Sequence, residues 1–353
     1  MASFSNWGND LHSGKRSIPF VGRRKLWLTI SLAFVILSVL VPVFRGGFNL
    51  GIEFRGGSEF QIADVKDTSA ELGQNAIREV LPEAEPRLTP TSDTAVRIQT
   101  EQLTDDQMQQ AREALVAAYQ VENGDVTSSF VGPAWGQDVT EKMARALVIF
   151  VALAAIGMAL YFRTWKMSVA AMVGLLQVMI VTMGIYSATG FEVTPVAVIG
   201  FLTVLSFALY DTVVVFDKIR ENTQDFQRNT RQKFSDMVNL GVNQTTVRSI
   251  NTSVVSVLPV AAILFIGVFV LGAGTLTDIA LSLFVGTIIA ALSTLFVASP
   301  LYSLLRSTEP AVKAQERKVE KTQADARDKG TGNTTTQAKV RSNKSSKKAE
   351  ARA

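Results

Sequence analysis

The chain contains no cysteine and only one histidine, and both shortages exclude kinds of chemistry. Without cysteine there is no disulfide, no thiolate metal ligand and no thiol nucleophile. The single histidine, His12, lies in a polar N-terminal stretch, where a solvated side chain is favoured over a proton relay or a metal ligand. The long polar segment from Arg45 to Glu141 has no Ser/His/Asp set, metal-ligand cluster or phosphate loop. We therefore expect no enzyme, no bound cofactor and no metal.

Long apolar runs, in contrast, are abundant. The chain has 353 residues, of which 47% are hydrophobic. A transmembrane helix needs ~20 apolar residues to cross ~30 Å of hydrocarbon. The runs of suitable length are residues 26–44, 146–162, 167–187, 193–216, 252–271 and 277–305. We predict six transmembrane helices, the first of which is too long for a secretory signal and lacks a small-residue cleavage site.

Lysine and arginine set the predicted orientation. They gather in residues 1–25, in the link 162–167 and in residues 217–248, which we place in the cytoplasm. The links 188–194 and 272–278 contain neither lysine nor arginine and fall outside. The sequence therefore predicts a multi-pass membrane protein with both termini cytoplasmic and residues 45–141 exported.

The exported segment 45–141 reads as a small folded domain. "SEFQIADV" and "DVTSSFVG" read as strands at its two ends, and two more strands are expected around the turn "TPTSD". Two helical stretches begin with candidate capping boxes, Thr68 with Glu71 and Thr104 with Gln107. The order β-α-β-β-α-β predicts a ferredoxin-like α+β fold. A binding or lever role is favoured over an enzymatic one.

The C-terminal residues 306–353 form a basic tail. From Ser307 onward, 12 Lys and Arg residues stand against 6 Asp and Glu, with almost no large apolar side chains. We predict that this tail is disordered and cytoplasmic. A solvated tail is favoured over contact with anionic lipid or ribosomal RNA, so no specific nucleic-acid partner is expected.

One carboxylate, Asp211, interrupts a run that is otherwise long and apolar enough to span the bilayer. A charge at mid-bilayer costs roughly 2.5–3.5 kcal/mol, so Asp211 needs a partner, a water path or a protonation role. Arg248 enters the membrane from the same side, which makes an ion pair sterically possible. Either Asp211 exchanges protons while Arg248 moves towards and away from it, or the two form a static pair that sets helix register.

Polar residues on two other predicted helices are further candidates for a site around Asp211. A stripe on the fifth apolar helix and one glutamine on the third are candidates for the lining of a proton pathway: Thr245, Asn251, Thr252, Ser256 and Gln177. For Gln177, an interhelical hydrogen bond is favoured over a place on a water path.

Glycine-bearing stretches flank the predicted domain. "FNLGIEFRGGSEF" follows the first apolar helix, and "VGPAWGQDV" leads into the second. From spacing alone, a hinge and ordinary turns are equally good interpretations of these glycines.

These two stretches, together with "YDTVVVFDKIREN" and "RSINTSVVSVLP" in this order, resemble the SecF members of the SecD/SecF family, within the resistance-nodulation-division (RND) superfamily. The resemblance covers roughly residues 20–305. Its motif residues outside the membrane are Gly51, Glu53, Gly56, Gly57, Gly132, Pro133 and Gly136. Glu53 stands where the family usually has aspartate, so the charge is kept.

The resemblance implies half of an RND-type transporter in the bacterial cytoplasmic membrane, with SecD as the second six-helix half. It implies that the proton gradient, rather than a cofactor, helps to draw unfolded preproteins through SecYEG, with YajC and YidC as further candidate partners. It matches Asp211 and Arg248 to membrane residues of the family that conduct protons. A subunit of an RND-type exporter of small molecules or lipids and a passive scaffold of the translocon remain the alternatives.

Overall fold

A computed structural model describes residues 2–92, 94–162, 164–269 and 275–324. The chain divides into two compact units. The larger unit comprises residues 25–213 and 246–298, and the smaller unit comprises residues 1–24, 214–245 and 299–353. Each unit is described by itself.

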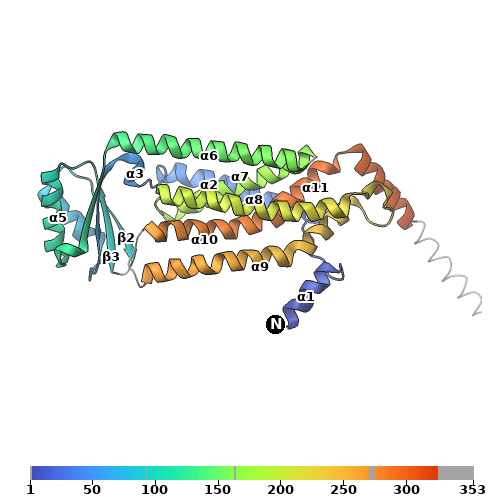
Figure 1. The fold of residues 1–353 in the computed structure, drawn as a ribbon, viewed down its shortest axis with the longest axis horizontal. Coiled ribbons are helices and arrows are strands. Elements are labelled where there is room, and N and C mark those ends of the chain that lie inside the picture. Colours follow the sequence, from blue (N-terminus) through green and yellow to red (C-terminus); the bar gives the residue numbers. More distant parts are fainter. Residues whose placement is uncertain (1, 93, 163, 270–274, 325–353) are drawn as a thin grey trace, which may run out of the picture. The chain divides into compact units, whose positions relative to one another are not determined.

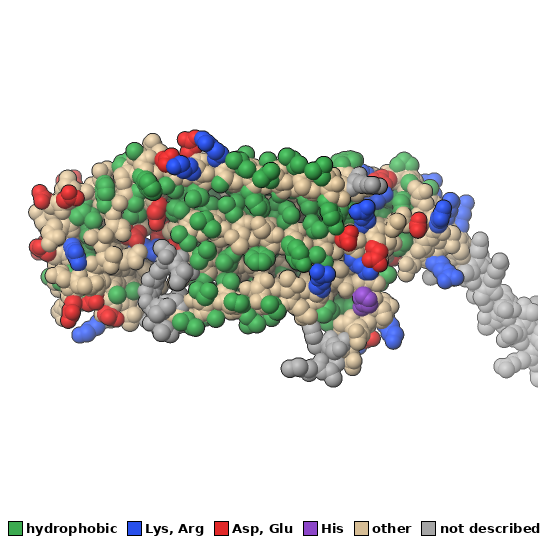
Figure 2. All heavy atoms as spheres, in the orientation of Figure 1, with side chains coloured by type: hydrophobic (Ala, Val, Ile, Leu, Met, Phe, Trp, Pro, Cys, Tyr) green, Lys and Arg blue, Asp and Glu red, His purple; other side chains and the backbone are tan. Residues whose placement is uncertain are grey.

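Six helical spans are long and apolar enough to cross a membrane, which confirms the predicted membrane fold. They are α2 (Arg24–Arg45), α6 (Pro133–Tyr161), α7 (Trp165–Thr189), α8 (Pro195–Thr223), α9 (Phe234–Phe269) and a last span built from α10 (Thr275–Ser293) and α11 (Ser299–Ser307). Hydrophobic side chains cover the helices on the face seen in Figure 2. Examples on α6 are Val148, Leu153 and Leu160, all exposed in the isolated chain.

Two of these helices begin earlier than the apolar runs predicted. Helix α6 begins at Pro133, in the N1 position, where the fixed φ of proline suits a helix start. Its first turns carry Asp138, Glu141 and Lys142, which end the apolar run without ending the helix. Helix α9 likewise begins at Phe234, before its apolar run. In both cases the thickness of the hydrocarbon limits the length of the apolar run, whereas the helix can continue beyond the membrane.

The sequence predicts one continuous α-helix for the last span, but the structure shows an interrupted one. Residues Thr294–Ala298 form a π-helical turn between α10 and α11. Pro300 follows closely, and proline has no amide hydrogen to give to the helical ladder. The π turn therefore lies where the regular hydrogen-bond pattern is already interrupted.

The α/β domain of the larger unit has the predicted element order. It contains β1 (Gly57–Ile62), α4 (Ala70–Val80), β2 (Arg87–Ser92), β3 (Ala95–Thr100), α5 (Asp105–Tyr119), the short 3₁₀ turn η1 (Asn123–Asp125) and β4 (Val126–Val131), preceded by the short α3 (Ile52–Arg55). The strands form an antiparallel sheet in the order β2-β3-β1-β4. This is the ferredoxin-like arrangement. In Figure 1 the sheet lies at the end of the helices where α6 begins.

The core of this domain lies between one face of the sheet and the helices α4 and α5. Phe60 and Ile98 point from the sheet into this core and meet Ile77 of α4 and Leu115 of α5, all fully buried. Burying such a side chain contributes roughly 1.5–3 kcal/mol relative to leaving it in water. The alternation along β1 and β3 leaves the opposite face of the sheet polar.

The two predicted capping boxes have different outcomes. The Thr104–Gln107 box is formed, with both reciprocal hydrogen bonds present. The Thr68–Glu71 box is wrong, because α4 starts one residue later with Ser69 as its N-cap. Asp67 instead accepts a hydrogen bond from the Ser69 amide at 2.8 Å. An Asx-type turn before the helix therefore replaces the capping box.

Small residues let α7, α8 and α10 pack closely within the larger unit. A Cβ added to Gly286 of α10 would lie 2.6 Å from a methyl group of Val204 in α8. Gly200 of α8 similarly faces Ser282 of α10. The small residues Ser282 and Gly286 of α10 are thus used for packing inside this chain.

In the smaller unit, asparagine side chains of α9 form hydrogen bonds with the backbone of the N-terminal segment. After α1 (Ala2–His12), the Ile18 amide donates to Asn243 at 2.8 Å and the Val21 amide donates to Asn239 at 3.0 Å. The unit also contains a short 3₁₀ turn, η2 (Phe226–Arg228). The Arg306 guanidinium lies 5.0–6.0 Å from the ring centres of Phe226, Phe234 and Tyr302.

The prediction of a disordered tail from residue 306 is wrong for its first part. Residues 310–324 are helical, and Val312 and Val319 are fully buried. Gln315 lies between them and donates to the carbonyls of Asn229 and Gln232 at 2.9 and 2.8 Å. The two valines and the glutamine recur at helical spacing, so they share one face of this amphipathic helix, and that face packs against the rest of the smaller unit. The rest of the predicted tail, 325–353, lies outside the described residues.

Candidate functional site

Asp211 lies on α8, about 24 Å along the helix from its first residue, Pro195. Its Oδ1 accepts a hydrogen bond from the Ser249 hydroxyl of α9 at 2.7 Å. Its Oδ2 is buried and has no hydrogen-bond partner among the described residues. A buried carboxylate oxygen without a partner is uncommon and calls for a chemical explanation.

A third helix completes the surroundings of Asp211. The hydroxyl groups of Thr212 in α8 and of Thr294, which directly follows α10, lie 3.2 Å apart, and both threonines are buried. Thr294 is also the first residue of the π-helical turn. Turns of this kind inside a helix frequently occur at functional sites. Helices α8, α9 and α10 therefore meet at one polar position.

Arg248 lies on α9 next to Ser249, as the predicted pairing requires, but the ion pair is not formed in this structure. Among the described residues, Arg248 donates to the Tyr210 hydroxyl at 3.3 Å and has no salt bridge with Asp211. Ser249 occupies the place next to the carboxylate. In this structure the partner of the carboxylate is Ser249, with Arg248 one residue away and exposed, and the predicted pairing with Arg248 in another state stays a prediction.

The predicted lining residues are not gathered around Asp211 by hydrogen bonds. Thr245 belongs to the smaller unit and donates to carbonyls of its own helix. Within the described part of the chain, Asn251, Thr252 and Ser256 make no side-chain hydrogen bond, and Gln177 Oε1 is buried without a partner. Their proposed place on a proton pathway stays a prediction.

The sequence interpretation missed Ser249, Thr212 and Thr294. Ser249 had a usable signal, because Thr245, Ser249 and Ser253 recur at four-residue spacing and share a helix face. Thr294 had none, since its position beside Thr212 depends on how α10 packs against α8.

Two glycines at the start of β1 adopt a conformation that other residues resist. Gly56 has φ of 77° and Gly57 has φ of 139°. A Cβ on Gly57 would lie 2.5 Å from the Thr100 carbonyl oxygen, and one on Gly136 would lie 2.9 Å from the Phe54 carbonyl oxygen. These are the requirements of a tight turn packed against a helix start.

Gly51 and Gly132 differ from this pair. Gly51 has an ordinary φ of −62°, but a Cβ there would meet Glu53 and Glu192. Gly132 faces open space directly before Pro133. Gly51 therefore serves close packing, whereas Gly132 is the N-cap of α6.

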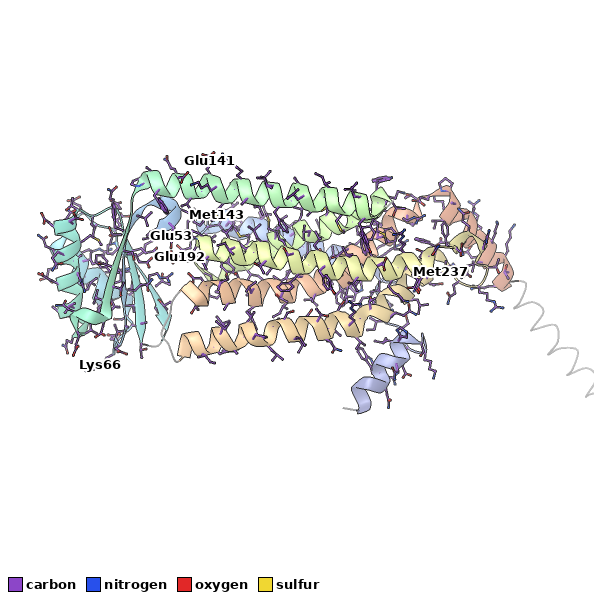
Figure 3. The ribbon with its side chains drawn as sticks, viewed as in Figure 1. Glu53, Lys66, Glu141, Met143, Glu192 and Met237 are labelled. Carbon is purple, nitrogen blue, oxygen red and sulfur yellow. The ribbon has the colours of Figure 1, made fainter. Side chains whose placement is uncertain are left out.

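Glu53 is partly buried in α3, and Figure 3 shows it beside Glu192. Burial raises the pKa of Glu53 above its ordinary value, and the neighbouring carboxylates of Glu59 and Glu192 raise it further. One Glu53 oxygen has no hydrogen-bond partner among the described residues. In the same part of the chain, no group of three or more histidine, cysteine or acidic residues is placed to hold a metal ion.

Two family models match this chain. The model for the protein export membrane protein SecD/SecF, C-terminal, matches residues 111–308. The SecD/SecF GG motif matches residues 44–63 and so contains Gly56 and Gly57.

Named relatives agree with these models. The protein translocase subunit SecF of Streptomyces coelicolor is 40% identical over 331 residues, covering 94% of this chain and 88% of the relative. SecF of Mycobacterium tuberculosis is 40% identical over 324 residues, covering 88% of this chain and 72% of the relative. SecDF of Brucella abortus is 29% identical over 297 residues, covering 80% of this chain but only 36% of the relative.

Solved structures show the same fold. A crystal structure of SecDF from a Thermus species, described as a translocon-associated membrane protein, matches with a TM-score of 0.72 at 24% identity, covering 83% of this chain and 39% of the SecDF chain. SecDF in a super-membrane-facing form matches with a TM-score of 0.59 at 26% identity, covering 85% and 40%. This chain thus spans well under half of the SecDF chains that it matches.

Proposed function

Because this chain belongs to the SecF proteins of the SecD/SecF protein-export family, we propose that it is one half of a two-part machine that uses the proton gradient to promote protein export. The observation that carries the energy-coupling part is Asp211. It is a carboxylate on a span-length helix, with one oxygen bonded to Ser249 and the other buried without a partner among the described residues.

The second half is SecD. This chain supplies six spans, and an RND-type transporter packs two such sets around a pseudo-twofold axis. In Brucella abortus, and in the solved SecDF structures, SecD and SecF names are joined in one chain of which this protein matches the smaller part. We propose that the large apolar surfaces of α2 and α6 contact lipid and SecD.

The distribution of lysine and arginine supports one orientation. Both termini lie in the cytoplasm of a bacterial cell, and the α/β domain lies on the outer side of the cytoplasmic membrane. There the domain would contact unfolded preprotein that leaves the SecYEG channel, with YajC and YidC as further partners. No cofactor is needed, because the proton gradient supplies the energy.

The proposed proton step uses the chemistry of three side chains. Asp211 accepts a proton on the oxygen that lacks a partner, while its other oxygen keeps the Ser249 bond. When the proton leaves, the carboxylate attracts the guanidinium of Arg248. In this structure that guanidinium donates a hydrogen bond to the Tyr210 hydroxyl. Exchange between these two arrangements moves α9 against α8 and couples proton flow to movement.

The test is Asp211→Asn in the full chain, co-reconstituted with SecD and SecYEG in vesicles that carry an imposed proton gradient. Asparagine keeps the size of the side chain and removes the exchangeable charge. We expect loss of gradient-dependent stimulation of preprotein translocation and unchanged recovery of the complex. Asp217→Asn, at an exposed position of the same helix, is the matched control and should keep the stimulation.

Full stimulation in the Asp211→Asn variant would refute proton coupling and favour a passive scaffold. Affinity purification of a tagged chain separates a translocase from an exporter. Recovery of SecD and SecYEG is expected for a translocase, and recovery of neither would support an exporter of small molecules or lipids.

A further inference from the structure

A buried ion-pair cluster joins the polar face of the sheet to the nearby helix ends. Gln61 faces Arg97, and Glu59 faces Gln99, across the β1–β3 ladder. Residues two apart on a strand share a face, so these four side chains lie together, opposite the core with α4 and α5. An antiparallel sheet often leaves this second face in water, yet Arg97 and Glu59 are each only 7% exposed here.

Arg97 reaches out of the sheet to the helices. Its Nη1 donates to Glu192 at 2.7 Å, in the link between α7 and α8. The same nitrogen lies 3.9 Å from Asp278 of α10, and its Nε lies 3.6 Å from Glu59 of β1. One guanidinium therefore faces three carboxylates that come from three different parts of the chain.

A second side chain strengthens this contact. Gln99 donates through its amide to both Glu59 and Glu192. The α7–α8 link is itself held by main-chain bonds, because the Val193 amide donates to Asn49 at 2.7 Å and the Gly51 amide donates to Val193 at 3.0 Å. The link thus presents Glu192 to the sheet from a fixed backbone.

The charges of the cluster are unbalanced. The titratable groups around Arg97 are Glu59 of β1, Glu192 of the link, Asp278 of α10, Glu53 of α3 beside Glu192, and the Tyr186 hydroxyl of α7 near Asp278. Burial lowers the pKa of Arg97, but the carboxylates of Glu59, Glu192 and Asp278 raise it above its ordinary value overall. Arg97 is therefore the fixed positive charge of the cluster.

We propose that the Arg97 cluster is a proton-sensitive latch: Arg97 fastens the sheet face to the Glu192 link and to α10, and proton uptake by the carboxylates releases the α/β domain. A protonated Asp278 no longer attracts the Arg97 Nη1, which lies 3.9 Å from it, so the buried guanidinium loses one of the charges that hold it. When the domain is released, water can reach the Arg97 guanidinium. This removes the free-energy cost of keeping that charge buried.

The latch goes beyond the proposed function and does not depend on proton exchange at Asp211. The latch lies at the ends of α8 and α10 nearest to the sheet, whereas Asp211 lies further along α8 and Thr294 lies beyond the other end of α10. It can therefore be tested without translocation.

The experiment is a distance measurement between two spin labels on the full chain in lipid nanodiscs. The chain has no cysteine, so Gln110→Cys on α5 and Ala188→Cys on α7, both exposed, give two unique labelling sites. Double electron–electron resonance then reports the distance distribution between domain and helices. We expect one narrow distribution at about pH 8 and a broader, longer one at about pH 5, where carboxylates with raised pKa values bind protons.

Arg97→Gln should give the broad distribution at both pH values, and Glu192→Gln should broaden it at about pH 8 already. Arg78→Gln, an exposed arginine on α4, is the matched control and should behave like the parent protein. If Arg97→Gln does not fold, Glu192→Gln decides the question, because it keeps the size of the side chain. Narrow distributions in these variants would overturn the latch, and an unchanged distribution between the two pH values would overturn its proton sensitivity.

Asp211→Asn distinguishes this proposal from the proposed function. If it abolishes gradient-driven stimulation while the distances still respond to pH, both proposals stand. A normal distance response together with normal stimulation would refute proton coupling at Asp211 and leave the latch.

Discussion

The Ser249 hydroxyl donates a 2.7 Å hydrogen bond to Asp211, while Arg248, the preceding residue, turns to the Tyr210 hydroxyl instead. Residues 248 and 249 of α9 thus contact residues 210 and 211 of α8 in matching order. A small change in the register of the two helices would exchange a neutral partner of Asp211 for a charged one. The geometry is that of a site with two available arrangements.

Ser249→Ala should lower gradient-driven stimulation, because the carboxylate loses the hydrogen bond that Ser249 donates. Hydrogen bonds to charged groups contribute about 1.5–3 kcal/mol, so the ionised form becomes harder to reach. Ser249→Thr keeps the hydroxyl and should keep most of the stimulation. The matched control is Ser253→Ala, since that hydroxyl donates to the Ser249 carbonyl of its own helix. Equal stimulation in Ser249→Ala and Ser253→Ala would argue against a role for the Asp211 bond.

Glu53→Gln should raise the thermal stability of the chain at high pH and have little effect in acid. The pKa of Glu53 is raised in the folded state, first by burial, so folding favours its protonated form. That contribution is fully present below the unfolded value of 4.5 and is lost as the pH rises through the higher folded value. The midpoint difference between variant and parent, measured by scanning fluorimetry, should therefore grow with pH.

Glu79→Gln on α4 is the control for this experiment. Glu79 is exposed, so its replacement should give a small difference that does not follow the same pH course. A Glu53→Gln midpoint that falls below that of the parent at about pH 8 would contradict the sign of the argument.

Gly57→Ala should destabilise the chain, whereas Gly132→Ala should be close to neutral. Gly57 combines a φ of 139° with a carbonyl oxygen 2.5 Å from where a Cβ would stand. Strain of this kind costs of order 1–3 kcal/mol. Gly132 has φ of −68° and open space around it. Unfolding of the two purified variants, followed by circular dichroism, compares them directly, and equal midpoints would show that the turn tolerates a side chain.

Gly286→Leu should disturb the packing of α10 on α8. The added side chain would press on Val204, and overpacking typically costs about 1–3 kcal/mol. Gly157→Leu on α6 is the control, because no described atom lies within 4 Å of a Cβ at that position in the isolated chain. Thermal unfolding should separate the two, with the lower midpoint for Gly286→Leu. Binding to SecD provides a second comparison, since Gly157 lies on a surface that the chain itself leaves open.

Local chemistry explains why the membrane fold and the ferredoxin-like domain were predictable. The length of the apolar runs predicts the six spans. The alternation of apolar and polar residues predicts the strands, and the Thr104 capping box predicts the start of α5. Helix bounds were less predictable, because α6 continues through charged turns that no hydrocarbon surrounds. The docked helix at residues 310–324 was missed since it rests on a narrow stripe, Val312, Gln315 and Val319.

The candidate site was predictable in part. A carboxylate in an apolar run identifies Asp211 from sequence alone, and chain direction brings α9 beside it. Whether Arg248 or Ser249 meets the carboxylate depends on helix rotation by one residue, about 100°, which composition does not encode. The Arg97 cluster had no signal, because its members come from strand, link and helix and meet only after the sheet is placed.

A single residue, Gly132, separates the last strand of the sheet from the second span, since β4 ends at Val131 and α6 begins at Pro133. Proline fixes the first torsion of the helix, so little slack remains at this junction. Helix α6 is 29 residues long, which makes it a rigid rod of about 43 Å. A tilt of that rod is passed to β4 as a rotation of the strand itself. The second span and the sheet are therefore directly linked, with Gly132 as the one residue between α6 and β4.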